Sequence, residues 1–359
     1  MIGDDEASSN EPRAAVGGRP MKFRHIVVQR TGGPEVMQLV EDDLPTPAIG
    51  EARVKVLAAD VSFSDVNLRR GRYPGGPRPP FTPGYAMVGV VDQLGPETHG
   101  PAVGQTVAAL TFYGSYSQYI CLPVDALVPV PAGVDPGEAV SLVLSYVSAY
   151  QMLHRLAHVG KGQRILVHGA AGGVGTAFLE LGHLSGLQMY GTASKPKHGL
   201  VSRLGATPID YHAEDFVTRI SALTSGAGVD AVFDPIGSAH LKQSVRAVRK
   251  GGTVVAYGFY EAANRGSNIL LDVLSQYLRL ALWSLPPQRK HVAFYDIRPM
   301  QKKHPNWFRE DLTALLDFLA AGKLRPVIAA RLPLEEASRA HELVEHREVQ
   351  GKLVLIPNR

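Results

Sequence analysis

A glycine cluster between an apolar run and a helix-like stretch constrains this chain more than any other feature of its sequence. The segment ILVHGAAGGVGTAFLELGHLSG runs from Ile165 to Gly186. The apolar residues predict a buried strand, and the spacing after the glycines predicts a helix. Gly172 and Gly173 lack a Cβ and permit a tight turn against a pyrophosphate, and Gly175 lets the helix lie close to the strand. Because free N–H groups at a helix start favour an anion, we predict a dinucleotide-binding loop.

Strand and helix signals alternate from about residue 136 onward. Continuous apolar strands such as RILVHG, LQMYGTAS and DAVFDPIG are separated by helix-like segments, which predicts a doubly wound parallel sheet with both faces covered. From 24 to 130 the chain consists of short β runs broken by Gly and Pro, typical of an antiparallel β domain. After about residue 300 we expect helix, strand, helix and strand, which return to this first domain. A length of 359 residues fits two domains.

The end of the second predicted strand bears on the choice of dinucleotide. NAD sites usually carry an acid there, which holds the ribose 2′-hydroxyl. This chain has Thr192, Ala193, Ser194 and Lys195 instead, with Tyr211 further along. Positive charge and hydroxyl donors suit a 2′-phosphate, so we predict NADPH rather than NADH. The alternative interpretation of Lys195 is an exposed lysine at the start of a helix.

Composition excludes several classes of function. Cys121 is the single cysteine, so the sequence has no disulfide framework and no cysteine-rich zinc site. The net charge of +4 arises from scattered Lys and Arg without interleaved aromatic residues, and we expect no nucleic-acid partner. No apolar run reaches the roughly 18 residues that span a bilayer, and residues 1–20 lack the features of a signal peptide. We therefore expect a disordered tail at 1–20, no membrane partner and a cytoplasmic location.

The chain resembles the zinc-free branch of the medium-chain dehydrogenase/reductases, the quinone oxidoreductase-like and enoyl reductase-like group. The resemblance covers about residues 22–357 and rests on VHGAAGGVG, GTASK, FDPIG, KGGTVVAYG, VSFSDVNLRRGRYP and GKLVLIP. It implies a Rossmann domain at 141–299 inserted in a β-rich, GroES-like catalytic domain made of 21–140 and 300–359. The active site is then expected in the cleft between the two domains. Relatives often pair through the last strand of the Rossmann sheet, which implies a homodimer.

The resemblance also assigns the cofactor contacts. They form a pyrophosphate group, a 2′-phosphate group and a nicotinamide group, and the lysine of GKLVLIP completes the predicted set. The residues are Gly172, Gly173, Val174 and Gly175 at the pyrophosphate, Ser194, Lys195 and Tyr211 at the 2′-phosphate, Gly258 and Phe259 at the nicotinamide, and Lys352.

No metal is expected. Zinc-using relatives place a cysteine and then a His-Glu pair in the first domain. The matching positions in this chain are Ser62, Tyr85 and Ala86, and none is a good zinc ligand at neutral pH. Alcohol dehydrogenation with a zinc Lewis acid is therefore not expected.

Reduction without a metal still leaves an anion on the substrate that needs a donor. The segment SDVNLRRGRYP resembles the enoyl-thioester reductases, in which the tyrosine of G-x-Y-P is the substrate-site acid, and this implies a catalytic role for Tyr73. The alternative is a loop tyrosine that packs on neighbouring prolines. Ser62, where many relatives have Asn, is the second catalytic candidate, and we expect Asp65 to anchor the loop.

These features together predict an NADPH-dependent oxidoreductase. Hydride would pass to a quinone or to an α,β-unsaturated carbonyl compound without a metal. Two alternatives stay open: a ketone reductase of a biosynthetic pathway, and an NADPH-binding interaction or regulatory protein with little catalysis.

Overall fold

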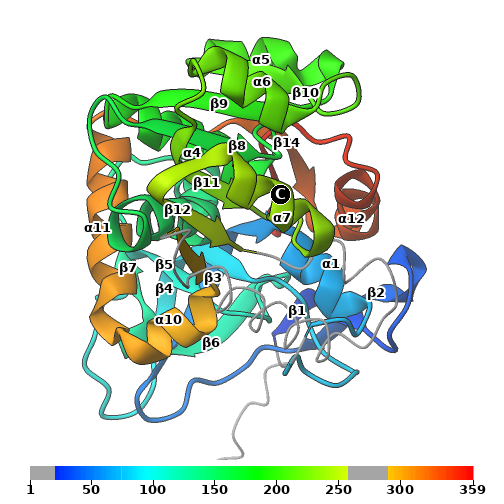
Figure 1. The fold of residues 1–359 in the computed structure, drawn as a ribbon. Coiled ribbons are helices and arrows are strands. Elements are labelled where there is room, and N and C mark those ends of the chain that lie inside the picture. The colour runs from blue at the N-terminus through cyan, green and yellow to red at the C-terminus, as the bar shows by residue number, and fades with distance from the viewer. Residues whose placement is uncertain (1–20, 74, 258–289, 359) are drawn as a thin grey trace, which may run out of the picture.

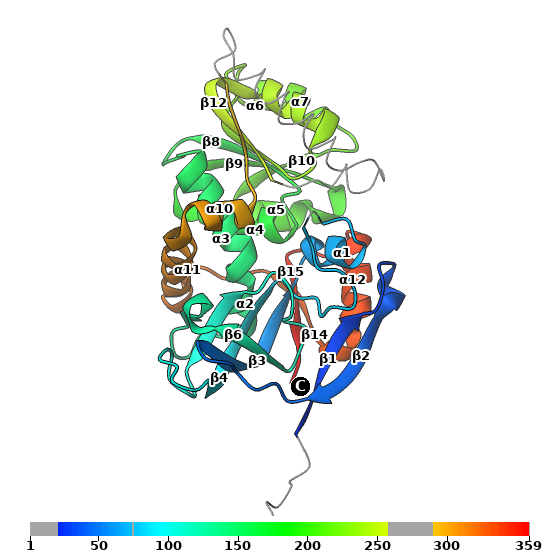
Figure 2. The same cartoon turned by 90° about the horizontal axis from the view of Figure 1, so that it is seen from below.

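The computed structural model describes residues 21–73, 75–257 and 290–358 (Figure 1). Their strands form a six-stranded parallel sheet, a seven-stranded mixed sheet and a two-stranded hairpin. Figure 2 shows the parallel sheet and its helices in the upper half of the view, and the seven-stranded sheet in the lower half. This arrangement confirms the predicted fold class, a doubly wound parallel sheet within a β-rich second unit.

The parallel sheet has the strand order β10-β9-β8-β11-β12-β13. Its strands are β8 (Arg164–His168), β9 (Gln188–Ala193), β10 (Ala206–Asp210), β11 (Val229–Asp234), β12 (Val248–Ala256) and β13 (His291–Phe294). The accompanying helices are α4 (Gly173–Leu184), α5 (His198–Arg203), α6 (Phe216–Leu223) and α7 (Ser238–Ala247). Within this sheet the chain begins at β8 and runs outward through β9 to β10. It then returns to the opposite side of β8 and runs outward through β11 and β12 to β13. The carboxyl ends of β8 and β11 therefore flank a crevice where ligands bind in such sheets.

The second sheet joins the two ends of the chain. Its order is β14-β15-β3-β4-β5-β7, and β6 also pairs with β3. Its strands are β3 (Glu51–Val61), β4 (Ala86–Leu94), β5 (Thr106–Leu110), β6 (Tyr119–Pro123), β7 (Val128–Pro129), β14 (Ile328–Pro333) and β15 (Lys352–Ile356), and the hairpin is β1 (Lys22–Val28) with β2 (Met37–Asp43). Because β15 pairs antiparallel with β3, the C-terminal segment returns to the N-terminal strands as predicted.

A buried helical segment connects the two sheets. It comprises α2 (Pro136–Ser141), a π-helical stretch (Leu142–Tyr146), α3 (Val147–Tyr150) and a second π-helical stretch (Gln151–Leu156). The other helices are α1 (Phe63–Arg69), α10 (Ile297–Lys303), α11 (Pro305–Ala320) and α12 (Ala337–Glu345), and the 3-10 turns are Pro34–Val36, Val124–Ala126, Lys195–Lys197 and Leu334–Glu336. The predicted helix, strand, helix and strand after residue 300 are thus α11, β14, α12 and β15.

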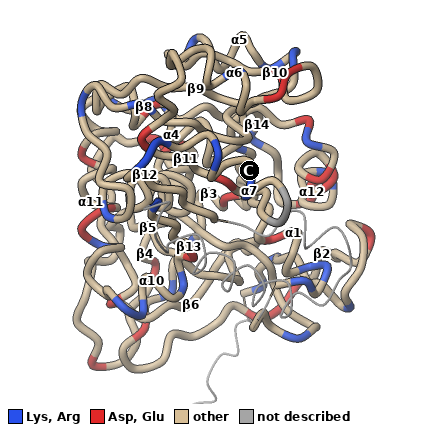
Figure 3. The backbone as a smooth tube through the Cα atoms, in the orientation of Figure 1, with Lys and Arg blue, Asp and Glu red and all other residues tan. Residues whose placement is uncertain are grey.

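One large apolar core holds the two sheets together. It includes side chains of β3 and β4, of the connecting helical segment and of β8, so both sheets share it. A smaller cluster lies between the parallel sheet and helices α6 and α7. Segments with Lys and Arg and segments with Asp and Glu are both spread over the molecule (Figure 3). Among the described residues, no helix combines the length and the apolar character needed to cross a bilayer.

Candidate active site between the two sheets

The glycine loop has the geometry that the sequence predicts. Gly169 follows β8 with φ +66°, a conformation that favours glycine, and Gly172 precedes α4 without a side-chain cap. A Cβ built at Gly175 would lie only 2.2 Å from the carbonyl oxygen of Gly169. Any side chain at Gly175 would therefore push the helix away from the loop. The uncapped helix start leaves backbone N–H groups for an anion.

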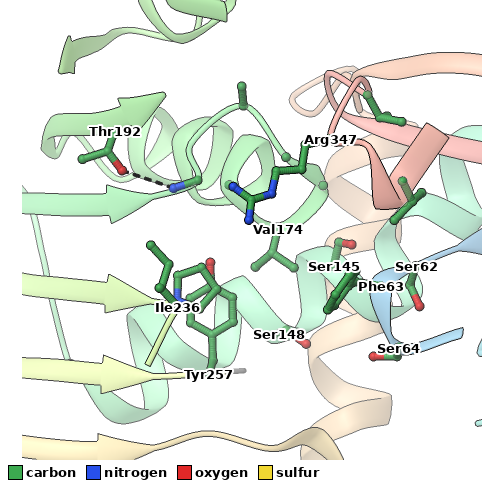
Figure 4. Close-up of a pocket in the computed structure, with 18 of the residues that line it drawn as sticks. Ser62, Phe63, Ser64, Ser145, Ser148, Val174, Thr192, Ile236, Tyr257 and Arg347 are labelled. Atoms are coloured by element: carbon green, nitrogen blue, oxygen red, sulfur yellow. Dashed lines mark hydrogen bonds between the residues drawn. The ribbon is translucent and has the colours of Figure 1, made fainter. Parts of the chain in front are cut away.

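Thr192, at the carboxyl end of β9, anchors this loop. Its hydroxyl accepts a hydrogen bond from the N–H of Gly169 at 3.3 Å, which is the dashed line in Figure 4. Its carbonyl accepts one from the N–H of Ala170 at 3.0 Å. The loop is thus held in place by the neighbouring strand before any ligand binds.

The C-terminal segment closes the other side of the loop. The N–H of Gly351 donates to the carbonyl of Ala171 at 2.9 Å, which joins the glycine loop to the start of β15. The next residue, Lys352, is 4% exposed and forms an ion pair of 2.6 Å with the fully buried Asp60. A Cβ built at Gly173 would lie 2.7 Å from Cδ of Lys352. The predicted cofactor residue Lys352 therefore places a cation directly beside the predicted pyrophosphate loop.

A cavity of about 1490 Å³ lies between the two sheets and contains most of the predicted site residues. Figure 4 shows contributions from both sides, with Val174 at the start of α4 and Ser62, Phe63 and Ser64 at the start of α1. The predicted residues that line it are Ser62, Tyr73, Gly172, Gly173, Val174, Gly175, Ser194, Tyr211 and Lys352. Gly258 and Phe259 lie outside the described residues.

The predicted 2′-phosphate residue Lys195 is the one described cofactor candidate outside the cavity lining. It is exposed and does not line the cavity, whereas Lys197 does. The 3-10 turn Lys195–Lys197 reverses the chain after β9, so two lysines two residues apart face different surroundings. Nζ of Lys197 donates to the carbonyls of Arg347 at 2.5 Å and Val349 at 3.2 Å. Of the two lysines in this turn, Lys197 therefore lines the cavity and Lys195 does not.

Arg347 is a second cavity-lining cation that sequence reasoning missed. Figure 4 shows its guanidinium directed into the cavity above Val174. The residue follows α12, about 150 positions after Lys197, and the hydrogen bond of Lys197 to its carbonyl brings the two basic side chains to the same end. The only feature of the sequence that could have pointed to Arg347 is its position four residues before the GKLVLIP segment.

The hydroxyl of Ser62 is committed to a helix cap. It donates to Oδ2 of Asp65 at 2.6 Å, and the backbone N–H of Asp65 donates back to it at 3.3 Å. Asp65 also accepts from the N–H of Gly84 at 3.1 Å, and burial raises the pKa of its carboxyl to about 7. Asp65 therefore anchors the loop as expected. The proton of Ser62 is engaged in the cap and does not face a substrate in this arrangement.

The predicted catalytic residue Tyr73 has its hydroxyl paired with a second tyrosine. The residue is partly buried and lines the cavity, and its Oη lies 2.8 Å from Oη of Tyr85. Burial raises the pKa of the Tyr73 phenol, while the hydrogen bond with Tyr85 opposes this shift. The phenol therefore keeps its proton at neutral pH and can act as a donor.

The positions that match the zinc ligands do not fit zinc. Ser62 is bonded to Asp65, Tyr85 to Tyr73, and Ala86 has no side-chain donor atom. Neutral hydroxyls are poor zinc ligands compared with the Cys, His and carboxylate groups of known sites. These three positions therefore do not fit a zinc ion, and the reaction proposed below does not use one.

A second polar cluster lies in the crevice between β8 and β11. Ligand atoms of His168, Asp234 and His240 lie within 4.8 Å of one another. The ring nitrogens of His168 contact the hydroxyls of Thr192 at 3.0 Å and Ser244 at 3.2 Å, and Asp234 Oδ2 accepts from Ser244 at 2.7 Å and contacts Nδ1 of His240 at 2.9 Å. Burial lowers the pKa of His168 to about 3 and keeps it neutral. Because these atoms are already paired, the cluster fits a structural network.

Comparison with known proteins agrees with this architecture. Two family models match the chain: the alcohol dehydrogenase GroES-like domain over residues 48–132 and the zinc-binding dehydrogenase over residues 204–355. The synaptic vesicle membrane protein VAT-1 homolog of Danio rerio is 29% identical over 339 residues, which cover 93% of this chain and 70% of that protein.

Solved structures extend the similarity to nearly the whole chain. Escherichia coli quinone oxidoreductase complexed with NADPH has a TM-score of 0.82 and 28% identity, covering 93% of this chain and 100% of the other. Quinone oxidoreductase of Pseudomonas syringae pv. Tomato DC3000 has a TM-score of 0.81 and 30% identity with the same coverage. Together with the glycine loop and the paired sheets, these matches show that the chain belongs to the medium-chain dehydrogenase/reductase superfamily and is an oxidoreductase similar to its quinone oxidoreductases.

Proposed function

We propose that the protein is an NADPH-dependent oxidoreductase that reduces a quinone or an α,β-unsaturated carbonyl compound without a metal ion. One observation carries the proposal: Gly173, at the start of α4 in the parallel-sheet half, and Tyr73, in the N-terminal half, line the same cavity. A dinucleotide held on the loop can thus share the cavity with a substrate beside Tyr73. The similarity to a quinone oxidoreductase that was solved with NADPH supports this function.

The cofactor site fits NADPH at its phosphate-binding end. Lys197, Arg347 and the exposed Tyr211 line the cavity near the end of β9, where the chain has no carboxylate at 192–195. Asp215, which also lines the cavity, uses its carboxylate to cap α6 by accepting from the N–H of Thr218 at 2.7 Å. These basic and hydroxyl groups suit a 2′-phosphate.

Residues of this chain would hold the cofactor and supply the proton. Bound NADPH would supply a hydride to the electron-poor carbon of the acceptor. The N–H groups of the glycine loop and the ammonium of Lys352 would hold the pyrophosphate, and Tyr73 would protonate or hydrogen-bond the anion left on the acceptor. The apolar side chains at the junction would exclude water from the anion.

The function should be visible in a small panel of acceptors. We expect NADPH oxidation with at least one of a quinone, an enone and an enoyl thioester, and much slower oxidation of NADH. Saturated alcohols with NADP⁺ should give no turnover. If NADPH binds but no member of the panel supports its oxidation, the catalytic proposal is wrong.

One observation favours an alternative. The hydroxyl of Ser62 is engaged with Asp65, which removes one of the two predicted donors and is compatible with an NADPH-binding interaction or regulatory protein. The same panel separates the two functions, because such a protein binds NADPH without oxidising it. A ketone reductase would instead turn over simple ketones.

We also propose the domain limits, assembly and location. Residues 141–299 would form the cofactor domain, and residues 21–140 with 300–359 the catalytic domain. The outer edge of β13 would pair with its counterpart in a homodimer, because β13 is the terminal strand of the parallel sheet among the residues that the structure describes, and a sheet edge invites pairing. A cytoplasmic location is consistent with a reaction that consumes NADPH.

A further inference from the structure

Three aromatic rings and one guanidinium meet below the cavity. The guanidinium carbon of Arg298 lies 4.6 Å from the ring centre of Tyr73, 5.6 Å from that of Tyr85 and 4.7 Å from that of Phe112. Arg298 belongs to α10, which follows the parallel sheet, whereas the three rings belong to the N-terminal segments around β4 and β5. The cluster therefore joins the two halves of the protein beside the predicted proton donor.

The direction of the hydrogen bond between Tyr73 and Tyr85 decides which hydroxyl keeps a proton for the cavity. Tyr85 is 0% exposed, and Oη of Tyr73 is the partner of its hydroxyl within the part of the chain that the structure describes. A buried hydroxyl donates where it has an acceptor, because an unused proton in the interior is costly. Tyr73 is the more exposed of the two residues, and both line the cavity. Either hydroxyl can donate in this pair, and the arrangement in which Tyr85 donates leaves the proton of Tyr73 for the cavity.

Arg298 adds positive charge next to this pair. Its Nε is buried without a hydrogen-bond partner, and within residues 21–73, 75–257 and 290–358 its guanidinium has no ion pair with a carboxylate. The rings of Tyr73, Tyr85 and Phe112 hold it instead. Burial and the nearby Asp296 raise the pKa of the Tyr73 phenol, whereas the charge on Arg298 lowers it. Arg298 therefore favours a transient negative charge on Tyr73 against these two opposing effects.

We propose that Tyr85 and Arg298 are positioning residues that prepare Tyr73 for proton donation. The inference rests on the proposed function. Bound NADPH would supply a hydride to the β-carbon of an enone and become NADP⁺, which would leave an enolate for Tyr73 to protonate. The O–H bond of Tyr73 breaks, its proton goes to the enolate, and the phenolate oxygen accepts the hydrogen bond of Tyr85 beside Arg298. A proton from solvent then restores the phenol of Tyr73, so that one turnover consumes one NADPH, one enone and one proton. Tyr85 stands where zinc-using relatives place a histidine ligand, so here a hydroxyl pair takes the place of the metal.

The first test is a double-mutant cycle with an enone substrate. Tyr85→Phe keeps the buried ring and removes the donor, so kcat should fall about 10-fold while the KM for NADPH stays unchanged. Tyr73→Phe should lower kcat further, and Tyr85→Phe should have no additional effect in the Tyr73→Phe background, because Tyr85 acts through Tyr73. Tyr113→Phe is the matched control, since Tyr113 is exposed and lies outside the cavity lining.

A second variant keeps the inference testable if Tyr85→Phe is poorly folded. Arg298→Met removes the charge and should lower kcat, and Arg298→Lys, which keeps it, should restore a large part of the rate. A melting temperature for each variant separates loss of fold from loss of rate.

The outcomes separate this inference from the proposed function. If the wild type is active and Tyr85→Phe has an unchanged kcat, the positioning role is overturned and the proposed function stands. The same holds if the losses of kcat in Tyr73→Phe and Tyr85→Phe are additive in the double variant. Equal losses of kcat in Arg298→Met and Arg298→Lys overturn the role of the charge. If the wild type fails to oxidise NADPH with every acceptor of the panel, both the proposed function and the positioning role are overturned.

Discussion

Replacing Lys197 by alanine should weaken the binding of NADPH much more than that of NADH. An ammonium has three donors, and Lys197 uses two of them on the carbonyls of Arg347 and Val349. The third is left for a 2′-phosphate at this end of the cavity. Loss of one hydrogen bond to a charged group costs about 1.5–3 kcal/mol, which corresponds to about a 10- to 150-fold weaker Kd. NADH lacks this phosphate, so its Kd should change little.

Lys195→Ala is the matched control. Lys195 has the same charge, lies two residues earlier in the same turn, is exposed and does not line the cavity. Titration of each variant with NADPH and NADH, followed by protein fluorescence or calorimetry, gives the four dissociation constants that are needed. Equal losses for both cofactors in Lys197→Ala, or a larger selective loss in Lys195→Ala, would refute the reasoning.

The other predictions concern the proton donor, the metal, stability and assembly. Tyr73→Phe should lower kcat for enones about 10- to 1000-fold with little change in NADPH affinity, measured by steady-state kinetics; an unchanged kcat contradicts the role. Chelators should alter neither activity nor melting, and one zinc per chain in elemental analysis would count against the site described above. Burial raises the pKa of Glu180 to about 7, above its unfolded value, so the free energy of unfolding should fall as pH rises from about 5 to 8, by at most about 1.4 kcal/mol per pH unit. In denaturant titrations at several pH values, the free energy of unfolding of Glu180→Gln should fall less steeply with pH than that of the wild type. An equal dependence on pH in both proteins would contradict the role of Glu180. Light scattering at micromolar concentration should give the mass of a dimer, and a monomer would exclude pairing through β13.

Local features of the site were predictable because they depend on neighbours in the sequence. The glycine loop follows from a strand, a turn and a helix within about twenty residues, and the structure places Gly172 and Gly175 as the sequence predicts. The cap between Ser62 and Asp65 was also within reach, because serine followed three residues later by an acidic residue is a helix-start pattern. That pattern was a sign that the Ser62 hydroxyl had a structural partner.

Other features depend on segments that meet only in the folded chain. The choice between Lys195 and Lys197 is decided by a single 3-10 turn, and charge patterns do not reveal which lysine faces inward. Arg347 reaches the cofactor end from a segment about 150 residues away. The contact of Tyr85 with Arg298 likewise joins β4 to α10. No periodic pattern in the sequence predicts which of these distant segments come into contact.

The transfer of deuterium from labelled NADPH tests the central claim most directly. The wild-type protein would be incubated with an enone and NADPH that carries deuterium at the transferable position of the nicotinamide ring, and the product examined by mass spectrometry and NMR. The account predicts a saturated ketone with deuterium at the β-carbon and a solvent-derived proton at the α-carbon. An enone that returns unlabelled and unreduced, in a sample where NADPH binding is saturated and the other acceptors also fail, would contradict it.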